Sequence, residues 1–183
     1  MNNMKDAFLV GENIYLRLIQ EEDVTDEYRS WFNDPEVCQY NEHHRFPMDR
    51  ERMREYFETV IKPRNDLVLA ICDKATDAHI GNVALQSIDR TSRHAEYAII
   101  IGNKNFWGKG IAKEASKLII KHGFAELNLH RIYCGTSSAN VGMQKVAESL
   151  GFVKEGVSRE ALWKDGKYQD AIQYGLLAHE FNG

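Results

Sequence analysis

Two glycines, Gly108 and Gly110, follow a run of β-branched residues and precede an amphipathic segment. Glycine allows the backbone to turn tightly, so that successive N–H groups point in one direction. A helix that starts directly after such a turn adds its own unpaired N–H groups and the positive end of its dipole. The stretch from residue 99 to residue 115 therefore predicts a cradle for an anionic group such as a phosphate.

Two better-known glycine motifs do not fit this stretch. A P-loop requires Gly, four residues, and then Gly-Lys followed by Ser or Thr, whereas five residues separate Gly102 from Gly108 and Gly110 follows Lys109. The dinucleotide-binding pattern requires a third glycine at position 113, which is lysine, and an acidic residue that ends a second parallel strand. Both motifs are excluded, and a different phosphate-binding function stays open.

Three strand-like runs come before the glycines, at residues 67–72, 79–85 and 93–101. Their composition and the short polar turns between them predict an antiparallel meander that ends at the glycine turn. A helix is predicted from Ile111 to about Leu127, and a further strand follows at residues 130–136. Because a helix connects the strands on either side of the turn, these two strands are predicted to be parallel neighbours.

Before residue 66, the pattern of apolar residues predicts one strand, at residues 13–18, and two helices. Acidic residues at positions 21–23 suit the start of the first helix, and Pro35 ends it. Asp49 is predicted to cap the second helix, which Pro63 ends. The apolar faces of the two helices consist of Val24, Tyr28, Trp31 and Phe32 in the first and Met53, Tyr56, Phe57, Val60 and Ile61 in the second.

After residue 136, the pattern of apolar residues predicts one more helix and two closing strands. The helix begins at Asn140 and stops at Gly151. The strands cover residues 153–162 and 168–178, and an Asp-Gly pair at 165–166 favours a hairpin between them. At 183 residues, the chain is long enough for one domain with its own core and slightly short for two.

Residues 105–110, Asn-Phe-Trp-Gly-Lys-Gly, resemble the acyl-CoA signature of the GNAT acetyltransferase superfamily, Gln/Arg-x-x-Gly-x-Gly/Ala. Asn105 departs from that signature, because it donates a hydrogen bond but lacks the reach of Gln or Arg and the charge of Arg. The order of the predicted elements resembles that of the family over about 165 residues. This resemblance implies an α/β GNAT fold, with a mixed central sheet of about seven strands flanked by four helices. It also implies a single domain over residues 1–183, with its core at about 13–178.

Several short segments are similar to the RimJ/RimL-like branch of that family. They lie at residues 16–18 together with Asp23, 31–37, 128–132, Asn140 ahead of 150–152, and 165–170. The branch includes acetyltransferases that act on ribosomal-protein N-termini, polyamines and nucleotide-linked amino sugars. The resemblance therefore implies an acetyl-CoA-dependent N-acetyltransferase, whose primary-amine acceptor attacks the thioester directly in a ternary complex. A non-catalytic CoA-binding module of the same fold is the alternative.

The resemblance also assigns a binding site for acetyl-CoA. It implies that backbone amides at the glycine turn bind the CoA pyrophosphate and that the strand at 98–101 pairs with the pantetheine arm. One free N–H of that strand then faces the thioester carbonyl, and such an oxyanion donor is worth roughly 2.7–4 kcal/mol of barrier. Asn140 resembles the family's asparagine near the thiol, and it also suits a helix N-cap. The implied cofactor residues are Ile99, Ile100, Ile101, Asn105, Trp107, Gly108, Lys109, Gly110, Ile111, Ala112 and Asn140.

The chemistry needs a base, because an alkyl amine with a pKa near 10.4 must lose a proton before it attacks. Glu96 resembles the family's water-linked base, although an alternating strand also places such a residue outward to solvent. The usual acids are missing, since Ala147 stands at the family's tyrosine position and Met143 at the serine position. A thiol with a pKa near 8.5 leaves with little help, so the acid is Tyr168, Ser138, a water molecule or no group at all.

The segment from Glu36 to Pro47 has no clear periodicity, which predicts an exposed polar loop or an acceptor-binding loop. Its adjacent histidines lack a third ligand at a suggestive spacing, so no metal site is predicted. The candidate acceptor-binding residues are Glu42, His43, His44, Arg45 and Glu160.

The overall composition excludes several classes of protein. The net charge of −4 argues against a nucleic-acid surface, and no apolar run reaches the ~20 residues that span a membrane. Cys38, Cys72 and Cys134 are widely spaced, which is typical of reduced core residues. The N-terminus lacks an apolar signal core, so a cytoplasmic location is predicted. The partners are then acetyl-CoA and an amine, and the family resemblance also allows a homodimer.

Overall fold

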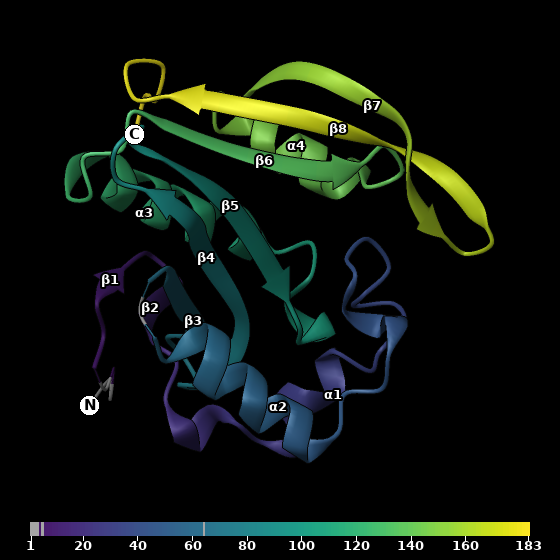
Figure 1. Cartoon of the computed structure of the whole chain (residues 1–183). Helices are drawn as coiled ribbons and strands as arrows, with labels where there is room; N and C mark the ends of the chain where they lie inside the picture. The colour runs from purple at the N-terminus through teal and green to yellow at the C-terminus, as the bar shows by residue number, and fades with distance from the viewer. Residues whose placement is uncertain (1–3, 5, 64) are drawn as a thin grey trace.

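The computed structural model describes residues 4, 6–63 and 65–183. In this part of the chain, one sheet of eight strands has the order β1-β2-β3-β4-β5-β6-β8-β7 (Figure 1). The strands are β1 (Leu9–Val10), β2 (Ile14–Leu18), β3 (Leu67–Asp73), β4 (His79–Asp89), β5 (His94–Ile101), β6 (Arg131–Ser137), β7 (Val153–Lys164) and β8 (Lys167–Leu177). The α-helices of these residues are α1 (Asp26–Trp31), α2 (Arg50–Tyr56), α3 (Ile111–Ala125) and α4 (Val141–Ser149).

The predicted mixed sheet with four flanking helices is confirmed, but the sheet of the described residues has eight strands rather than about seven. The additional strand, β1, has only two residues and pairs with β2. The predicted meander is present, because β3, β4 and β5 pair antiparallel. The predicted parallel pair is also present, between β5 and β6.

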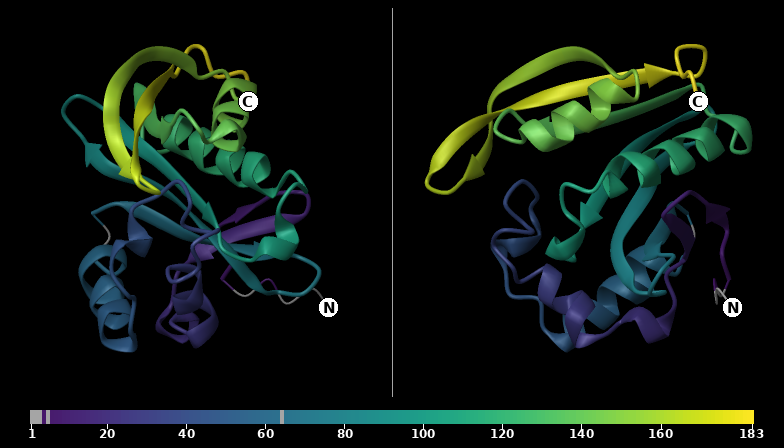
Figure 2. Two further views of the ribbon diagram at one scale, coloured as in Figure 1. Left: turned by 90° about the vertical axis from the view of Figure 1, so that its right-hand side faces the viewer. Right: turned by 180° about the vertical axis from the view of Figure 1, so that it is seen from behind.

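The helices cover opposite faces of the sheet, with α1 and α2 on one face and α3 and α4 on the other (Figures 1 and 2). The larger core lies under α3 and α4, where Ile119 and Ala147 pack among strand residues such as Leu85 and Ile132. The core under α2 is smaller and includes Phe57, which packs with Tyr15, Ala70 and Cys72. No helix in the described part of the chain has the length and hydropathy to cross a membrane.

Both predicted N-terminal helices differ in detail from the structure. The acidic residues Glu21–Asp23 form a separate 3₁₀ turn, and α1 starts only after Thr25, whose side chain accepts a hydrogen bond from the Tyr28 N–H. Asp49 caps α2 as predicted, by accepting from the Arg52 N–H at 2.8 Å. The prediction that Val60 lies on the apolar side of the second helix with Phe57 and Ile61 is wrong in detail. Val60 is exposed, because α2 continues as a π-helical turn over Phe57–Ile61 and this turn changes the helical phase.

Strands β5 and β6 pair over only part of their length. The pairs are His94 with Arg131, Ala95 with Ile132, and Glu96 with Tyr133. Beyond Glu96 the two strands diverge, so residues 98–101 have β4 on one side and no β6 residue paired on the other (Figure 1). The sheet is therefore open between β5 and β6, and the opening starts at Glu96.

Candidate active site

The glycine turn follows the C-terminal end of β5, beyond the opening that starts at Glu96. Gly108 has φ +72° and Gly110 has φ +78°, and a Cβ at either position would meet no atom within 4 Å. Left-handed backbone of this kind strains any residue except glycine. The turn is therefore held in its conformation by glycine, with open space in front of it.

Gly110 is also the N-cap of α3, and no side chain caps this helix. The first hydrogen bond of the helical ladder runs from the Glu114 N–H to the Gly110 carbonyl at 3.0 Å. The N–H groups of Ile111, Ala112 and Lys113 precede that bond, so the ladder gives them no acceptor. They lie at the positive end of a 15-residue helix, and N–H groups in such a position suit an anionic group.

The segment before the glycines is anchored to β5. The indole Nε1 of Trp107 donates to the carbonyl of Ile101 at 2.8 Å, and the Asn103 side chain accepts from the Asn105 N–H at 3.1 Å. The Lys109 ammonium lies 5.4 Å from the centre of the Phe106 ring. The predicted cofactor residues from Ile99 to Ala112 thus form one continuous segment, while Asn105, Trp107 and Lys109 themselves stay exposed.

Asn140 begins α4 and acts as its N-cap, because its Oδ1 accepts from the Met143 N–H at 3.0 Å. This contact confirms the capping role, and the predicted role near the thiol stays a prediction. Ala147 lies on the core face of α4 and is fully buried. A tyrosine at this position would require the core under α4 to repack, so the missing acid is a feature of how this helix packs.

Glu96 is the last residue of β5 that pairs with β6. Its strand neighbours Ala95 and Tyr97 are buried in the core under α3 and α4, so the Glu96 side chain lies on the opposite face, the one that carries α1 and α2. Gln86 on β4 donates to its carboxylate, with Nε2 3.2 Å from Oε2. Glu96 is half-buried and lies on the far side of the sheet from α3, at the vertex of the opening.

A cleft of about 150 Å³ lies on that same face. Its walls come from residues at the end of α1, from an irregular segment, from α2 and the turn after it, and from strands β3, β4 and β5. The irregular segment, residues 33–47, is called the acceptor loop below, after the acceptor-binding role predicted for residues 36–47. The lining residues are Phe32, Asn41, His43, Tyr56, Val60, Asp66, Val68, Asn82, Val83, Ala84, Gln86, Ala98, Ile99 and Ile100. Because Gln86 lines the cleft and contacts Glu96, the carboxylate lies next to it.

The amide of Asn82 is held in place by two side chains below the cleft. Its Nδ2 donates to the hydroxyl of Tyr28 at 2.8 Å, and its Oδ1 lies 2.8 Å from Nε2 of His79. Burial raises the pKa of the Tyr28 hydroxyl and lowers the pKa of His79, so both side chains are neutral at pH 7. The floor of the cleft is thus a fixed, uncharged polar network.

His43 is the one predicted acceptor residue that lines the cleft among the residues that the structure describes. Its ring lies edge-on to Phe32, with the ring centres 4.8 Å apart. Partial desolvation against the rings of Phe32 and Tyr56 lowers the pKa of His43 below its ordinary value of 6.5, although the residue keeps an exposed surface, and the nearby charge of Glu42 opposes this shift. The imidazole is therefore mainly neutral at pH 7.

The other predicted acceptor residues lie elsewhere. Glu42 and Arg45 form an exposed ion pair at 2.7 Å, and His44 beside them is exposed as well. Glu160 lies in a bulge of β7, where its N–H donates to the Asp170 carboxylate at 2.9 Å. The structure does not bring these residues to the lining of the cleft, so their role as acceptor contacts stays a prediction.

Tyr168 and Ser138, the two side chains predicted as alternative acids, are both exposed. Tyr168 is 62% exposed near the end of the β7–β8 hairpin, with its ring centre 4.7 Å from that of Trp163. Glu96 on β5 pairs with Tyr133 on β6, and Tyr133 pairs with Gly175 on β8. Tyr168 therefore lies seven residues along β8 from the residue that is in line with Glu96.

Asn82 and Gln86 were not among the predicted site residues. They are polar residues in a mostly apolar strand, and this was a usable signal in the sequence.

The three cysteines are buried and unpaired. Burial raises the pKa of the Cys134 thiol to about 12, and it also raises the pKa values of Cys38 and Cys72. A thiol that stays protonated is a poor nucleophile. The described site therefore favours direct attack by a bound amine over a covalent acyl-cysteine intermediate.

Comparisons with known proteins agree with this geometry. A family model described as an acetyltransferase (GNAT) domain matches residues 13–153. The chain is 34% identical over 182 residues to "Uncharacterized N-acetyltransferase p20" of Bacillus licheniformis, which covers 96% of this chain and 98% of that protein. It is 34% identical over 101 residues to the spermidine N(1)-acetyltransferase of Escherichia coli (strain K12), with 55% and 54% coverage. The structure of the spermidine N-acetyltransferase from Vibrio cholerae, in complex with CoA and spermine, matches with a TM-score of 0.83 and 26% identity, over 93% of this chain and 99% of that one.

Proposed function

Because the chain belongs to the GNAT acetyltransferase family, we propose that this acetyl-CoA-dependent N-acetyltransferase acetylates a cationic alkyl amine of the polyamine class. The acceptor binds in the cleft beside Glu96, and the acetyl-CoA thioester binds in the opening between β5 and β6. The observation that carries the proposal is the lining of the cleft. Lysine and arginine are absent from its described lining, which combines aliphatic side chains with aromatic rings, the imidazole of His43, amides and the carboxylate of Asp66.

This lining supports an ammonium acceptor over one of the alternatives that the family resemblance allows, the nucleotide-linked amino sugar. A nucleotide-linked amino sugar carries a diphosphate, and burying that charge requires cationic groups that the described lining does not provide. An ammonium group is attracted to the faces of aromatic rings such as Phe32 and Tyr56 and to the carboxylates of Asp66 and Glu96. The names of the spermidine acetyltransferases among the similar proteins agree with this choice.

The proposed reaction uses Glu96 as the base and a main-chain N–H of β5 as the oxyanion donor. Glu96 takes the proton that the ammonium must lose, and the free amine attacks the thioester carbonyl. The unpaired edge of β5 beyond Glu96 supplies an N–H to the oxyanion that forms. The C–S bond breaks and CoA leaves as its thiolate, which needs little help because a thiol has a pKa near 8.5. The second proton of the attacking nitrogen, which the amide cannot keep, passes to this thiolate or to water.

The proposal is tested by incubating the purified protein with acetyl-CoA and a panel of amines, while free thiol and product mass are followed. The panel contains spermidine, an aliphatic monoamine, a peptide with a free N-terminus and a nucleotide-linked amino sugar. We expect the highest kcat/KM with spermidine, and little turnover of the amino sugar. Preference for the peptide or the amino sugar would contradict the polyamine assignment. Tight CoA binding without any acetylated product would favour the non-catalytic module.

A further inference from the structure

The β7–β8 hairpin extends beyond the rest of the sheet. The last residue of β6, Ser137, pairs with Ala171, so the part of β8 before Asp170 pairs with β7 alone. This overhang carries the exposed side chains of Trp163 and Tyr168. An isolated two-stranded hairpin is only marginally stable in water, so a contact elsewhere is needed to hold the overhang in one position.

A bulge in β7 sets the direction of the overhang. The register shifts between Ser158 and Leu162, and Glu160 within the bulge has φ +52°. The Asp170 carboxylate on β8 accepts the N–H of Glu160 at 2.9 Å and so fixes the bulge. Bulges bend strands and aim side chains in new directions, and this one directs the hairpin end toward the acceptor loop (Figure 1).

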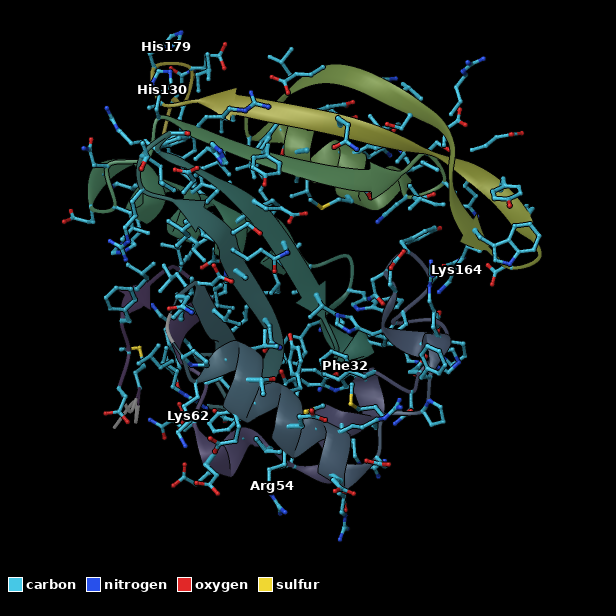
Figure 3. All side chains as sticks on the ribbon, viewed as in Figure 1. Phe32, Arg54, Lys62, His130, Lys164 and His179 are labelled. Carbon is cyan, nitrogen blue, oxygen red and sulfur yellow. The ribbon has the colours of Figure 1, made fainter. Side chains whose placement is uncertain are left out.

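Lys164 makes the contact between the two segments. Its Nζ lies 2.9 Å from the carbonyl oxygen of Cys38 and 3.1 Å from that of Asn41, more than 120 residues away in the sequence. The labelled Lys164 in Figure 3 lies on the part of the hairpin that faces the acceptor loop. Hydrogen bonds from a charged donor are roughly twice as strong as neutral ones.

The two carbonyls belong to the turn that positions the wall of the cleft. Asn41 lines the cleft, and its Oδ1 accepts the N–H of His43, which also lines it, at 3.0 Å. The Cys38 thiol is buried and donates to the Trp31 carbonyl at 3.2 Å, which fixes the start of the turn on α1. The turn is therefore fixed at its start by Cys38 and held along its outer side by Lys164.

We propose that Lys164 is a positioning residue for the acceptor, which acts by fastening the β7–β8 hairpin to the acceptor loop and so fixing Asn41 and His43 in the wall of the cleft. This inference rests on the proposed function, since it assumes that the acceptor binds in that cleft. Its direct structural consequence is independent of the acceptor. Without the lysine ammonium, the acceptor loop and the hairpin end exchange their amide hydrogens faster.

The test compares Lys164→Met, which removes the donors but keeps the length of the chain, with Lys164→Arg, which restores a charged donor. Lys167→Met is the matched control, because Lys167 is exposed on β8 at the position paired with Lys164. Hydrogen exchange is followed in peptides that cover residues 33–47. We expect at least about threefold faster exchange in Lys164→Met, and exchange near the wild-type rate in the other two variants.

Kinetics on the acceptor found in the amine panel provide the second measurement. We expect the KM for the amine to rise roughly tenfold in Lys164→Met. The kcat and the CoA affinity stay within about twofold, and Lys164→Arg recovers most of the loss. An unchanged exchange rate and an unchanged KM would overturn the inference even if the protein acetylates amines. If no amine is acetylated, the proposed function fails and the exchange measurement still decides the role of Lys164. Lys164→Leu, which also lacks a donor, replaces Lys164→Met if the latter does not fold.

Discussion

The proposed cofactor side and the proposed acceptor side of the site are built in different ways. On the cofactor side, one continuous segment from β5 through the glycine turn into α3 supplies main-chain groups, and its shape depends on the positive φ angles of Gly108 and Gly110. On the acceptor side, side chains from α1, the acceptor loop, α2 and three strands come together, and contacts between distant segments hold them. A main-chain site tolerates changes in its side chains, whereas a site built from side chains on separate elements responds to a change in any one of them.

Glu96 lies between the two sides, and changing it should affect the chemical step far more than it affects the binding of CoA. We expect Glu96→Gln to lower kcat/KM by roughly 10²–10⁴-fold at neutral pH, because a positioned general base contributes about that much. The affinity for CoA measured by calorimetry should stay within about twofold. This is the largest effect that we predict.

Asp66→Asn is the matched control for this prediction, since Asp66 lines the same cleft and lies outside the opening between β5 and β6. Its effect should fall on the KM for a cationic amine and leave the pH–rate profile intact. A Glu96→Gln enzyme with the wild-type pH–rate profile would remove Glu96 from the role of base.

Gly110→Ala should weaken only the cofactor side. The exposed turn can relax away from φ +78° once it carries a Cβ, and CoA binding must then restore the strained conformation. Left-handed backbone costs an L-residue roughly 1–2 kcal/mol, so we expect CoA affinity to fall by about 5- to 30-fold. Gly166→Ala has the same kind of strain at φ +74° in the hairpin turn and should leave CoA affinity unchanged. Equal losses in the two variants would show that the effect is general destabilisation.

The two sides also differ in how much of them the sequence reveals. The glycine turn was predictable, because a main-chain cradle needs consecutive residues and leaves a short motif at 105–110. The order of elements was predictable for a similar reason, since hydrophobic periodicity and turn residues are local signals. The two-residue strand β1 and the π-helical turn after α2 were missed, because each depends on tertiary packing that local patterns do not report.

The acceptor side was mostly hidden from the sequence. Of the five predicted acceptor residues, His43 alone lines the described cleft, while Glu42 and Arg45 pair with each other. Neighbouring polar residues in an irregular segment need not face the same way, so their proximity in sequence overestimates their proximity in the site. Asn82 and Gln86 stand out as polar residues in a mostly apolar strand, but the sequence does not show which way they face. The sheet register and their contacts with Tyr28 and Glu96 place them at the cleft.

The pH dependence of acceptor binding should report on the charge of His43. The affinity for CoA should not depend on this charge, so the measurement also distinguishes the two sides of the site. Partial desolvation against Phe32 and Tyr56 lowers the pKa of His43, so the ring gains its charge only as the pH falls below about 6.5. A positive ring in the cleft repels a cationic amine, and the KM for spermidine should rise with acidification by about two- to fivefold more in the wild type than in His43→Gln. Parallel KM profiles in the two proteins would contradict a cationic acceptor beside His43. His44→Gln, which changes an exposed neighbour, is the control.

Lys104 provides the most direct link between the two sides, and its effect should be the smallest. It lies just before the glycine turn, and its ammonium is 2.8 Å from the Asp34 carboxylate and 2.9 Å from that of Glu36, both in the acceptor loop. The hydrogen bond from Lys104 holds the pKa of Asp34 below its usual range, so the pair stays charged at neutral pH. Lys104 and Glu36 are exposed to solvent and Asp34 is partly exposed, and ion pairs of this kind are weak and screened by salt.

We therefore expect Lys104→Met to reduce the coupling between CoA and the acceptor by at most about fivefold at low salt, and less at high salt. The coupling is measured as the ratio of CoA affinities with and without saturating amine. A double-mutant cycle with Glu36→Gln separates the ion pair from other effects of losing the lysine. A cycle in which the coupling energy is zero would mean that the two sides act independently. A larger coupling that persists at high salt would mean that the loop moves together with the cradle, which the separate construction of the two sides does not predict.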